Sequence, residues 1–199
     1  MEPIPVEKAI SIFKQHNTLQ TSQAIRLGIA PRTLYALRDT GQIIELTRGV
    51  YRLADAPPLS QTDLVQVTLR IPKGVICLIS ALAFHNLTIQ IPHEVYVALP
   101  LDAEKPRLTY PPVRLFWLSP QTYSAGIQEH TLDGVTVRLY NREKTIADCF
   151  KYRNKVGLNV ALEALKEGLG QGCKPDSIMD FARLDRVERI IRPYLEALS

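Results

Sequence analysis

The segment APRTLYALRDTGQIIELTRGVYRL, residues 30–53, carries the side chains best suited to chemistry in this chain of 199 residues. A helix can begin at Pro31, because the missing amide proton costs nothing in a first turn. Leu34 and Leu37 then face inward and anchor the helix, while long donor side chains remain on its other faces. A helix of this kind can present donors to base edges and phosphates. The segment therefore predicts a recognition helix for double-stranded DNA.

A hairpin is predicted directly after this helix. The β-rich stretches 42–46 and 50–53 flank the turn Thr47-Arg48-Gly49, so Arg48 would place a cation at the tip of a wing. Thr21 is expected to cap, through its hydroxyl, the N-terminus of the helix over 21–28, which comes before the recognition helix. The candidate DNA-binding residues are Thr21, Arg32, Thr33, Tyr35, Arg38, Arg48 and Tyr51.

These residues need a frame, and the first quarter of the chain predicts one. Apolar side chains at helical spacing predict a helix over 5–16, followed by helices over 21–28 and 31–40 and then the hairpin. This order is that of a winged helix-turn-helix. The Pro-rich stretch DAPPLS, residues 55–60, reads as a linker. We therefore expect a DNA-binding domain over 1–56 and a second domain over 57–199.

The second domain is predicted to have a mixed α/β composition, which makes the whole chain α+β. Asp133-Gly134 between two β-rich runs is a strong hairpin signal. The expected strands are 94–99, 113–118, 127–132 and 135–140. The expected helices are 61–71, the second half of 75–87, 142–153, 157–169, 175–183 and 185–198.

The charge of the chain is unevenly distributed. The formal net charge is +4, and residues 1–54 hold seven basic and four acidic side chains. A basic excess in a small N-terminal segment favours contact with a polyanion. A second basic excess lies between Arg138 and Lys155, a segment that contains six basic and two acidic residues.

This second cluster has two interpretations. On a helix beginning near Asn141, Lys144, Lys151 and Lys155 would share roughly one outer face, opposite a buried stripe of apolar residues. The face is either a polyanion site or an ordinary solvated surface. The candidate polyanion-binding residues are Arg142, Lys144, Lys151, Arg153 and Lys155.

Other functions find little support in the residues. The sequence has no run long enough to cross a bilayer, and its three separated cysteines favour a reducing, cytoplasmic location. His85 and His93 lack further ligands for a metal, and Cys149 lies on the predicted apolar stripe rather than beside a base. We therefore expect no catalytic residues, no metal, no cofactor and no membrane contact.

Three segments resemble one known family. LYALRDTGQIIELTRGVYRL is similar to the N-terminal winged-helix domain of AbiEi-family antitoxins of type IV toxin-antitoxin systems. GVICLISALAFHNLTIQIPHEVYVALP and VRLYNREKTIADCFKYRNKVGLNVALEALKEGL resemble the C-terminal region of the same family. The likeness covers about residues 5–170.

The resemblance implies a non-enzymatic repressor and antitoxin. Its first domain is expected to bind repeated operator DNA and to repress its own operon. Its second domain is expected to oppose a nucleotidyltransferase-like toxin without requiring a stable complex with it. Two alternatives stay open: an enzyme that processes nucleotides or nucleic acid and is targeted by the winged helix, and a winged helix that docks a protein.

Overall fold

The computed structural model describes residues 4–57, 59 and 61–198. The chain forms two compact units, which are described separately below. The first unit comprises Met1–Arg70 together with Thr131–Thr136, and the second comprises Ile71–His130 and Val137–Ser199. Pro58 and Ser60 of the predicted linker lie outside the described residues.

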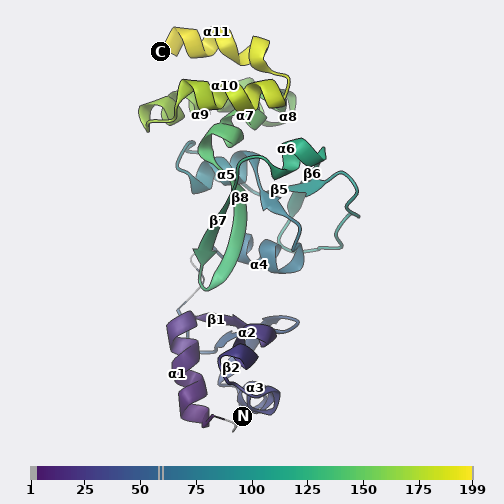
Figure 1. The fold of residues 1–199 in the computed structure, drawn as a ribbon, viewed down its shortest axis with the longest axis vertical. Coiled ribbons are helices and arrows are strands. Elements are labelled where there is room, and N and C mark those ends of the chain that lie inside the picture. Colours follow the sequence, from purple (N-terminus) through teal and green to yellow (C-terminus); the bar gives the residue numbers. More distant parts are fainter. Residues whose placement is uncertain (1–3, 58, 60, 199) are drawn as a thin grey trace. The chain divides into compact units, whose positions relative to one another are not determined.

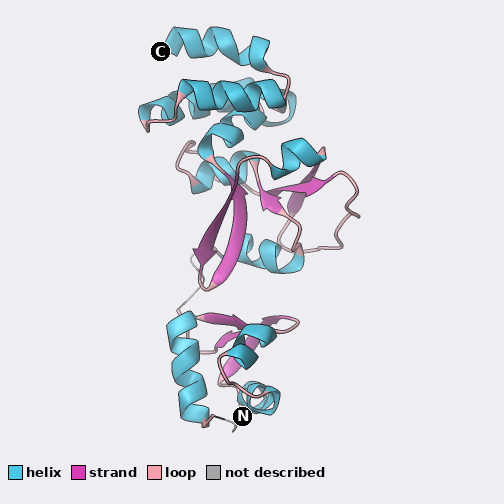
Figure 2. Cartoon of the chain, viewed as in Figure 1, coloured by secondary structure: helices cyan, strands magenta, loops and turns pink. Residues whose placement is uncertain are grey.

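The first unit contains the predicted winged helix-turn-helix. Its three strands form an antiparallel sheet in the order β1-β3-β2, and Figure 2 shows the helices that accompany this sheet. The α+β prediction and the order of helices before the hairpin are confirmed. The elements are α1 (Val6–His16), β1 (Thr18–Gln20), α2 (Thr21–Arg26), α3 (Pro31–Asp39), β2 (Ile43–Thr47), β3 (Val50–Leu53) and α4 (Thr62–Arg70).

Apolar side chains from every element between α1 and β3 close a core inside this unit. Phe13 from α1, Leu34 and Leu37 from α3 and Tyr51 from β3 are all buried in it. Gly28 ends the α2 segment with a positive φ of 91°, a conformation that glycine adopts without strain. The core thus fixes α3 by its inner side and leaves its other side to solvent.

Two local predictions for this unit were wrong. Strand β1 was not expected, because its three residues pair with β3, which lies about thirty residues later in the chain. Thr21 is the first residue of α2 rather than its cap. The cap is Gln20, whose backbone N–H donates to the Gln23 side chain at 2.9 Å.

The second unit is built on a five-stranded mixed sheet in the order β6-β5-β4-β8-β7. Strand β5 runs antiparallel to β4 and parallel to β6, and β4 runs parallel to β8. Its strands are β4 (Val75–Ile76), β5 (Val95–Pro100), β6 (Val113–Leu118), β7 (Ile127–Leu132) and β8 (Val135–Tyr140).

Helices gather on one side of this sheet (Figure 1). Among them, α7 is the central one, because it contacts α5, α8, α9, α10 and α11. All its residues from Lys144 to Phe150 are buried. The helices are α5 (Leu78–Phe84), α6 (Pro120–Ser124), α7 (Arg142–Lys151), α8 (Arg153–Val156), α9 (Leu158–Gly170), α10 (Pro175–Leu184) and α11 (Glu188–Leu198).

Most of these elements match the predicted ranges. The turn between β7 and β8 has positive φ at Asp133 and Gly134, as the Asp-Gly signal predicts. Helix α6 was not expected, and the stretch predicted as one helix over 142–153 divides into α7 and α8. Tyr152 makes this division, because its φ of −100° and ψ of 21° depart from helical values.

Candidate nucleic-acid interface

Helix α3 exposes a cationic and aromatic face. Arg32 is exposed, and the Tyr35 side chain keeps 48% of its surface in contact with solvent. Arg38 is exposed as well. These three predicted residues are therefore available to a ligand, and their helix is held by Leu34 and Leu37 in the core.

Arg38 is ordered by two neighbours on the same helix. Its Nε and Nη2 donate to Oδ1 of Asp39 at 3.0 and 2.8 Å. Its guanidinium carbon lies 5.2 Å from the centre of the Tyr35 ring, within the range of a cation–π contact. The side chains of Tyr35, Arg38 and Asp39 form a connected group, which we call the α3 charge cluster.

The wing is a tight turn that is fastened to α2. Residues 48–49 connect β2 and β3, and the Gly49 N–H donates to the Glu45 carboxylate at 2.7 Å. The Gly49 carbonyl accepts from the Thr21 N–H at 2.8 Å and from the Thr21 hydroxyl at 3.1 Å. Arg48 is exposed at this turn. Its charge is thus carried on a tip that Glu45 and Thr21 hold in place through Gly49.

The structure corrects the placement of two predicted DNA-binding residues. Thr33 and Tyr51 are buried, with 9% and 3% of their surfaces exposed. Tyr51 belongs to the core of the first unit, and burial, together with nearby Glu45, raises the pKa of its hydroxyl. Both residues support the interface from within. Thr21 is half-buried and acts on the wing through its hydroxyl.

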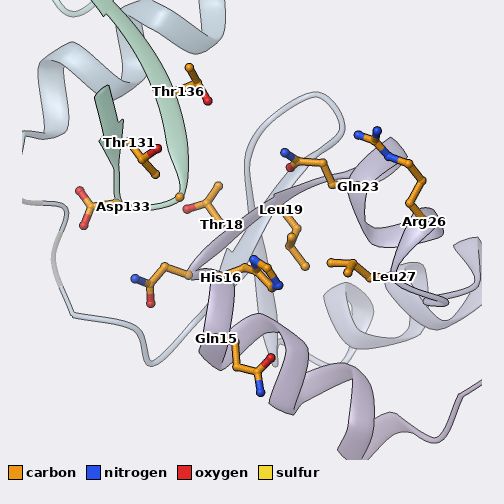
Figure 3. Close-up of a pocket in the computed structure, with 12 residues that line it drawn as sticks. Gln15, His16, Thr18, Leu19, Gln23, Arg26, Leu27, Thr131, Asp133 and Thr136 are labelled. Carbon is orange, nitrogen blue, oxygen red and sulfur yellow. The ribbon is translucent and has the colours of Figure 1, made fainter. Parts of the chain in front are cut away.

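The first unit also contains a polar pocket of about 630 Å³. Figure 3 shows His16, Thr18 and Gln23 among its lining side chains. The Thr18 hydroxyl is buried and has no hydrogen-bond partner within the described part of the chain. None of the predicted DNA-binding residues lines this pocket. The full lining is Gln15, His16, Asn17, Thr18, Leu19, Gln23, Arg26, Leu27, Thr131, Asp133, Gly134 and Thr136.

In the second unit, the structure overturns the expectation that Lys144 faces outward. Its side chain is 0% exposed, and its ammonium pairs with Asp148 and, at 3.2 Å, with Asp185. Lys151 reaches the other oxygen of Asp185 at 3.0 Å. These four residues form a buried charge network that joins α7 to the residue after α10. Lys144 is enclosed by this network and cannot bind an external polyanion, whereas the Lys151 side chain lies at its edge and is 29% exposed.

The two carboxyl groups of the network differ in acidity. Burial raises the pKa of Asp148 to about 8, against the opposing charge of Lys144. Burial acts in the same direction on Asp185. However, the hydrogen bond with Asp148 and the charges of Lys144 and Lys151 hold the pKa of Asp185 below its ordinary value. Burial thus favours the neutral form of Asp148, whereas the surroundings of Asp185 favour its ionised form.

The other members of the predicted cluster have different surroundings. Arg142 is exposed, whereas Arg153 is half-buried and donates to the Phe150 carbonyl at 3.0 Å. Lys155 is exposed, and its ammonium lies 5.2 Å from the Phe116 ring and 5.7 Å from the Tyr152 ring. The basic residues therefore do not form the single outer face that the spacing predicted.

Two acidic residues belong to these arrangements and were not predicted. Asp39 follows Arg38 directly, and this adjacency was the available signal. Asp185 lies 41 positions after Lys144, so no local pattern could pair them. The i,i+4 spacing of Lys144 and Asp148 beside the apolar stripe of this helix was the detectable signal for a buried pair.

The part of the chain that the structure describes contains no group of three or more His, Cys, Asp or Glu that could hold a metal ion. Cys149 is buried, and burial raises the pKa of its thiol well above the ordinary value, which disfavours the nucleophilic thiolate. No helix in the described ranges is long and apolar enough to span a membrane.

The fold and the exposed face of α3 define the first unit as a winged helix-turn-helix domain. Comparison with known families agrees with this class. Residues 7–54 match the family described as "Transcriptional regulator, AbiEi antitoxin". The predicted resemblance to AbiEi antitoxins is therefore confirmed for this N-terminal segment. A search of curated proteins gave no match to the chain.

Proposed function

We propose that the chain is a sequence-specific DNA-binding repressor that binds through α3 and the wing. The observation that carries this proposal is the set of exposed side chains Arg32, Tyr35, Arg38 and Arg48 on a winged helix-turn-helix frame. Guanidinium groups can bind guanine edges in a bidentate manner, and they can bind phosphates on the adjacent backbone. The family of residues 7–54 supports a regulatory role.

The proposal extends to the biological setting. The repressor would act in the cytoplasm on operator repeats upstream of its own operon. The second unit would supply antitoxicity against a nucleotidyltransferase-like toxin, without requiring a stable complex. The chain would act as a non-enzymatic regulator without a cofactor. These points extend the family assignment of the first unit to the whole chain.

The exposed or half-buried basic residues of the second unit remain candidates for the antitoxic contact. They are Arg142, Lys151, Arg153 and Lys155, and a polyanion such as RNA is the ligand that their chemistry fits. Lys144 is left out of this set because it lies inside the buried charge network.

The DNA-binding proposal is tested with duplexes selected from a random pool. The full-length chain is incubated with the pool, and bound duplexes are recovered over several rounds and sequenced. We expect enrichment of a common motif, and binding to the enriched duplex that is tighter than binding to the starting pool. Absence of both enrichment and shifted duplex at low salt would reject the proposal.

We also propose that residues 1–56 form an independent DNA-binding domain. The core of the first unit is made by residues 9–53, with Ile4 and Ala56 packed against it, so it closes before the linker. The first compact unit, however, extends to Arg70 and so includes α4. A fragment ending at Ala56 should fold cooperatively and bind the enriched duplex. If folding requires extension to Arg70, the boundary lies after α4.

A further inference from the structure

We infer that Asp39 is a specificity-determining residue of the α3 face, and that it acts by restraining Arg38. The inference rests on the proposed DNA-binding function and names the class of contact that this face selects. The Arg38–Asp39 pair favours the edge of a G·C base pair in the major groove over backbone phosphate.

The contact geometry provides the first argument. Two of the guanidinium nitrogens of Arg38 donate to one carboxylate oxygen of Asp39, at 3.0 and 2.8 Å. The Tyr35 ring supports the same guanidinium from its face. Arg38 therefore has to exchange Asp39 for a new acceptor before the same nitrogens can bind DNA.

The position of Asp39 on the helix is the second argument. Asp39 is four residues after Tyr35 and seven after Arg32, so the three side chains follow one stripe of α3. At 1.5 Å per residue, Arg32 and Asp39 are separated by about 10 Å along the axis. A recognition helix lies in the major groove, so two residues this close on one stripe can fall within a single footprint.

The carboxylate has little value for stability at this place. Asp39 is the last residue of α3, and an acidic side chain at a helix C-terminus is unfavourable. The pair is open to solvent, with 40% of the Arg38 and 65% of the Asp39 side chain exposed, so the ion pair adds little to folding. We therefore expect the charge of Asp39 to affect ligand binding rather than folding.

Base edges and phosphates respond differently to this arrangement. A phosphate is repelled by the Asp39 carboxylate and has to compete with it for Arg38. A guanine offers Arg38 two acceptors, N7 and O6, while its paired cytosine offers Asp39 a donor, N4. A G·C pair can therefore use both side chains, whereas the backbone can use Arg38 alone.

The test compares the full-length chain with Asp39→Asn, which keeps the size of the side chain and removes its charge. Two probes are used: the enriched duplex and the starting random pool. We expect Asp39→Asn to bind the pool about fivefold more tightly, on the scale of an exposed charge interaction. The ratio of affinities for enriched duplex and pool should fall accordingly.

Two matched variants separate the alternatives. Asp55→Asn removes an equal charge from an exposed position of the same unit and should leave the ratio unchanged. In an Arg38→Ala background, Asp39→Asn should change the ratio less than in the parent, because the restraint on Arg38 is gone and only the direct action of the carboxylate on DNA remains. Thermal unfolding checks that all variants are folded.

The outcomes are distinguishable. An unchanged ratio in Asp39→Asn overturns the inference while the proposed function stands. An equal change in the presence and absence of Arg38 overturns the restraining role, because simple repulsion then accounts for the effect. If the parent chain enriches no duplex and binds neither probe, the proposed function itself fails, and the inference fails with it.

Discussion

Helices α3 and α7 each carry a basic–acidic pair, and the two pairs lie in opposite environments. Arg38 and Asp39 are 40% and 65% exposed, whereas Lys144 and Asp148 are 0% and 2% exposed. α3 packs by one side and is open to solvent along the other. α7 is surrounded by five helices of its unit. Residue type and nearness in the sequence thus indicate an ion pair in both helices, while packing determines whether the pair is available to a ligand or enclosed in the fold.

The energetic consequences also differ. An exposed pair is screened by water and contributes about 0–1 kcal/mol. A buried pair contributes little net stability when it is intact, but removal of one partner leaves an uncompensated charge. Mutations in α3 should therefore change binding, and mutations in α7 should change folding.

The largest effect is expected from Lys144→Ala. It leaves Asp185 and Asp148 buried without their shared cation, so the free energy of unfolding should fall by about 3–5 kcal/mol. Urea unfolding followed by circular dichroism measures this change. Lys155→Ala serves as the control, because this exposed lysine makes no ion pair within the part of the chain that the structure describes. A loss below 1 kcal/mol for Lys144→Ala would contradict the buried network.

The next effect concerns DNA affinity. Arg32→Ala, Arg38→Ala and Arg48→Ala should each leave the fold intact, because all three side chains are exposed. A base contact should cost about 1–3 kcal/mol and relax specificity at one position of the motif. A phosphate contact should weaken all sequences alike. Fluorescence anisotropy with single-position variants of the enriched duplex separates the two cases.

The pH dependence of folding stability is a second test of the buried charge network. The pKa of Asp148 is about 8 in the folded chain and near 4 when unfolded, so between these values the folded state binds one proton more. This contribution to stability is complete below about pH 4 and is lost as pH rises through 8. Asp148→Asn, which cannot titrate, should remove it.

The measurement is the difference in unfolding free energy between parent and Asp148→Asn. From pH 6 to 7, the parent should lose up to about 1.4 kcal/mol relative to the variant. Asp185 does not interfere, because its pKa lies below the ordinary value and its contribution is lost only at lower pH. A constant difference across this interval would mean that Asp148 is ionised in the folded chain.

The smallest effect on stability is expected for the exposed basic residues of the second unit. Arg142→Ala with Lys155→Ala should change the free energy of unfolding by no more than about 1 kcal/mol in total. If these residues make the proposed antitoxic contact, cells that express a cognate toxin should survive less well with this variant at equal protein level. Operator binding in the same strain should persist. Unimpaired survival would identify these residues as an ordinary solvated surface.

Local patterns predicted much of the fold. The strands 113–118, 127–132 and 135–140 match because alternation and the Asp-Gly turn are encoded within a few residues. Strand β1 was missed because its partner is distant in the sequence. The burial of Thr33 and Tyr51 depends on how α3 and β3 pack, which helical spacing and composition do not specify.

The candidate sites show the same limit. Arg32, Tyr35 and Arg38 could be chosen from one helix, because a single buried stripe determines which positions stay outside. Lys144 could not be placed in this way, because α7 packs against five helices and the second partner of Lys144, Asp185, comes from outside α7. Exposure could be predicted for a helix at a surface and not for a helix at the centre of a unit.

The salt dependence of DNA binding is the measurement that shows whether α3 and the wing form the DNA-binding surface. The dissociation constant of the enriched duplex is measured between low and physiological salt for the parent and for the triple variant Arg32→Ala, Arg38→Ala, Arg48→Ala. We expect a steep loss of affinity for the parent as salt rises. Each neutralised phosphate contributes about −0.9 to the slope of the logarithm of the binding constant against the logarithm of the salt concentration. The slope of the triple variant should be smaller by about one for each arginine that contacts phosphate. Equal affinities and equal slopes for the two proteins would show that α3 and the wing are not the DNA-binding surface.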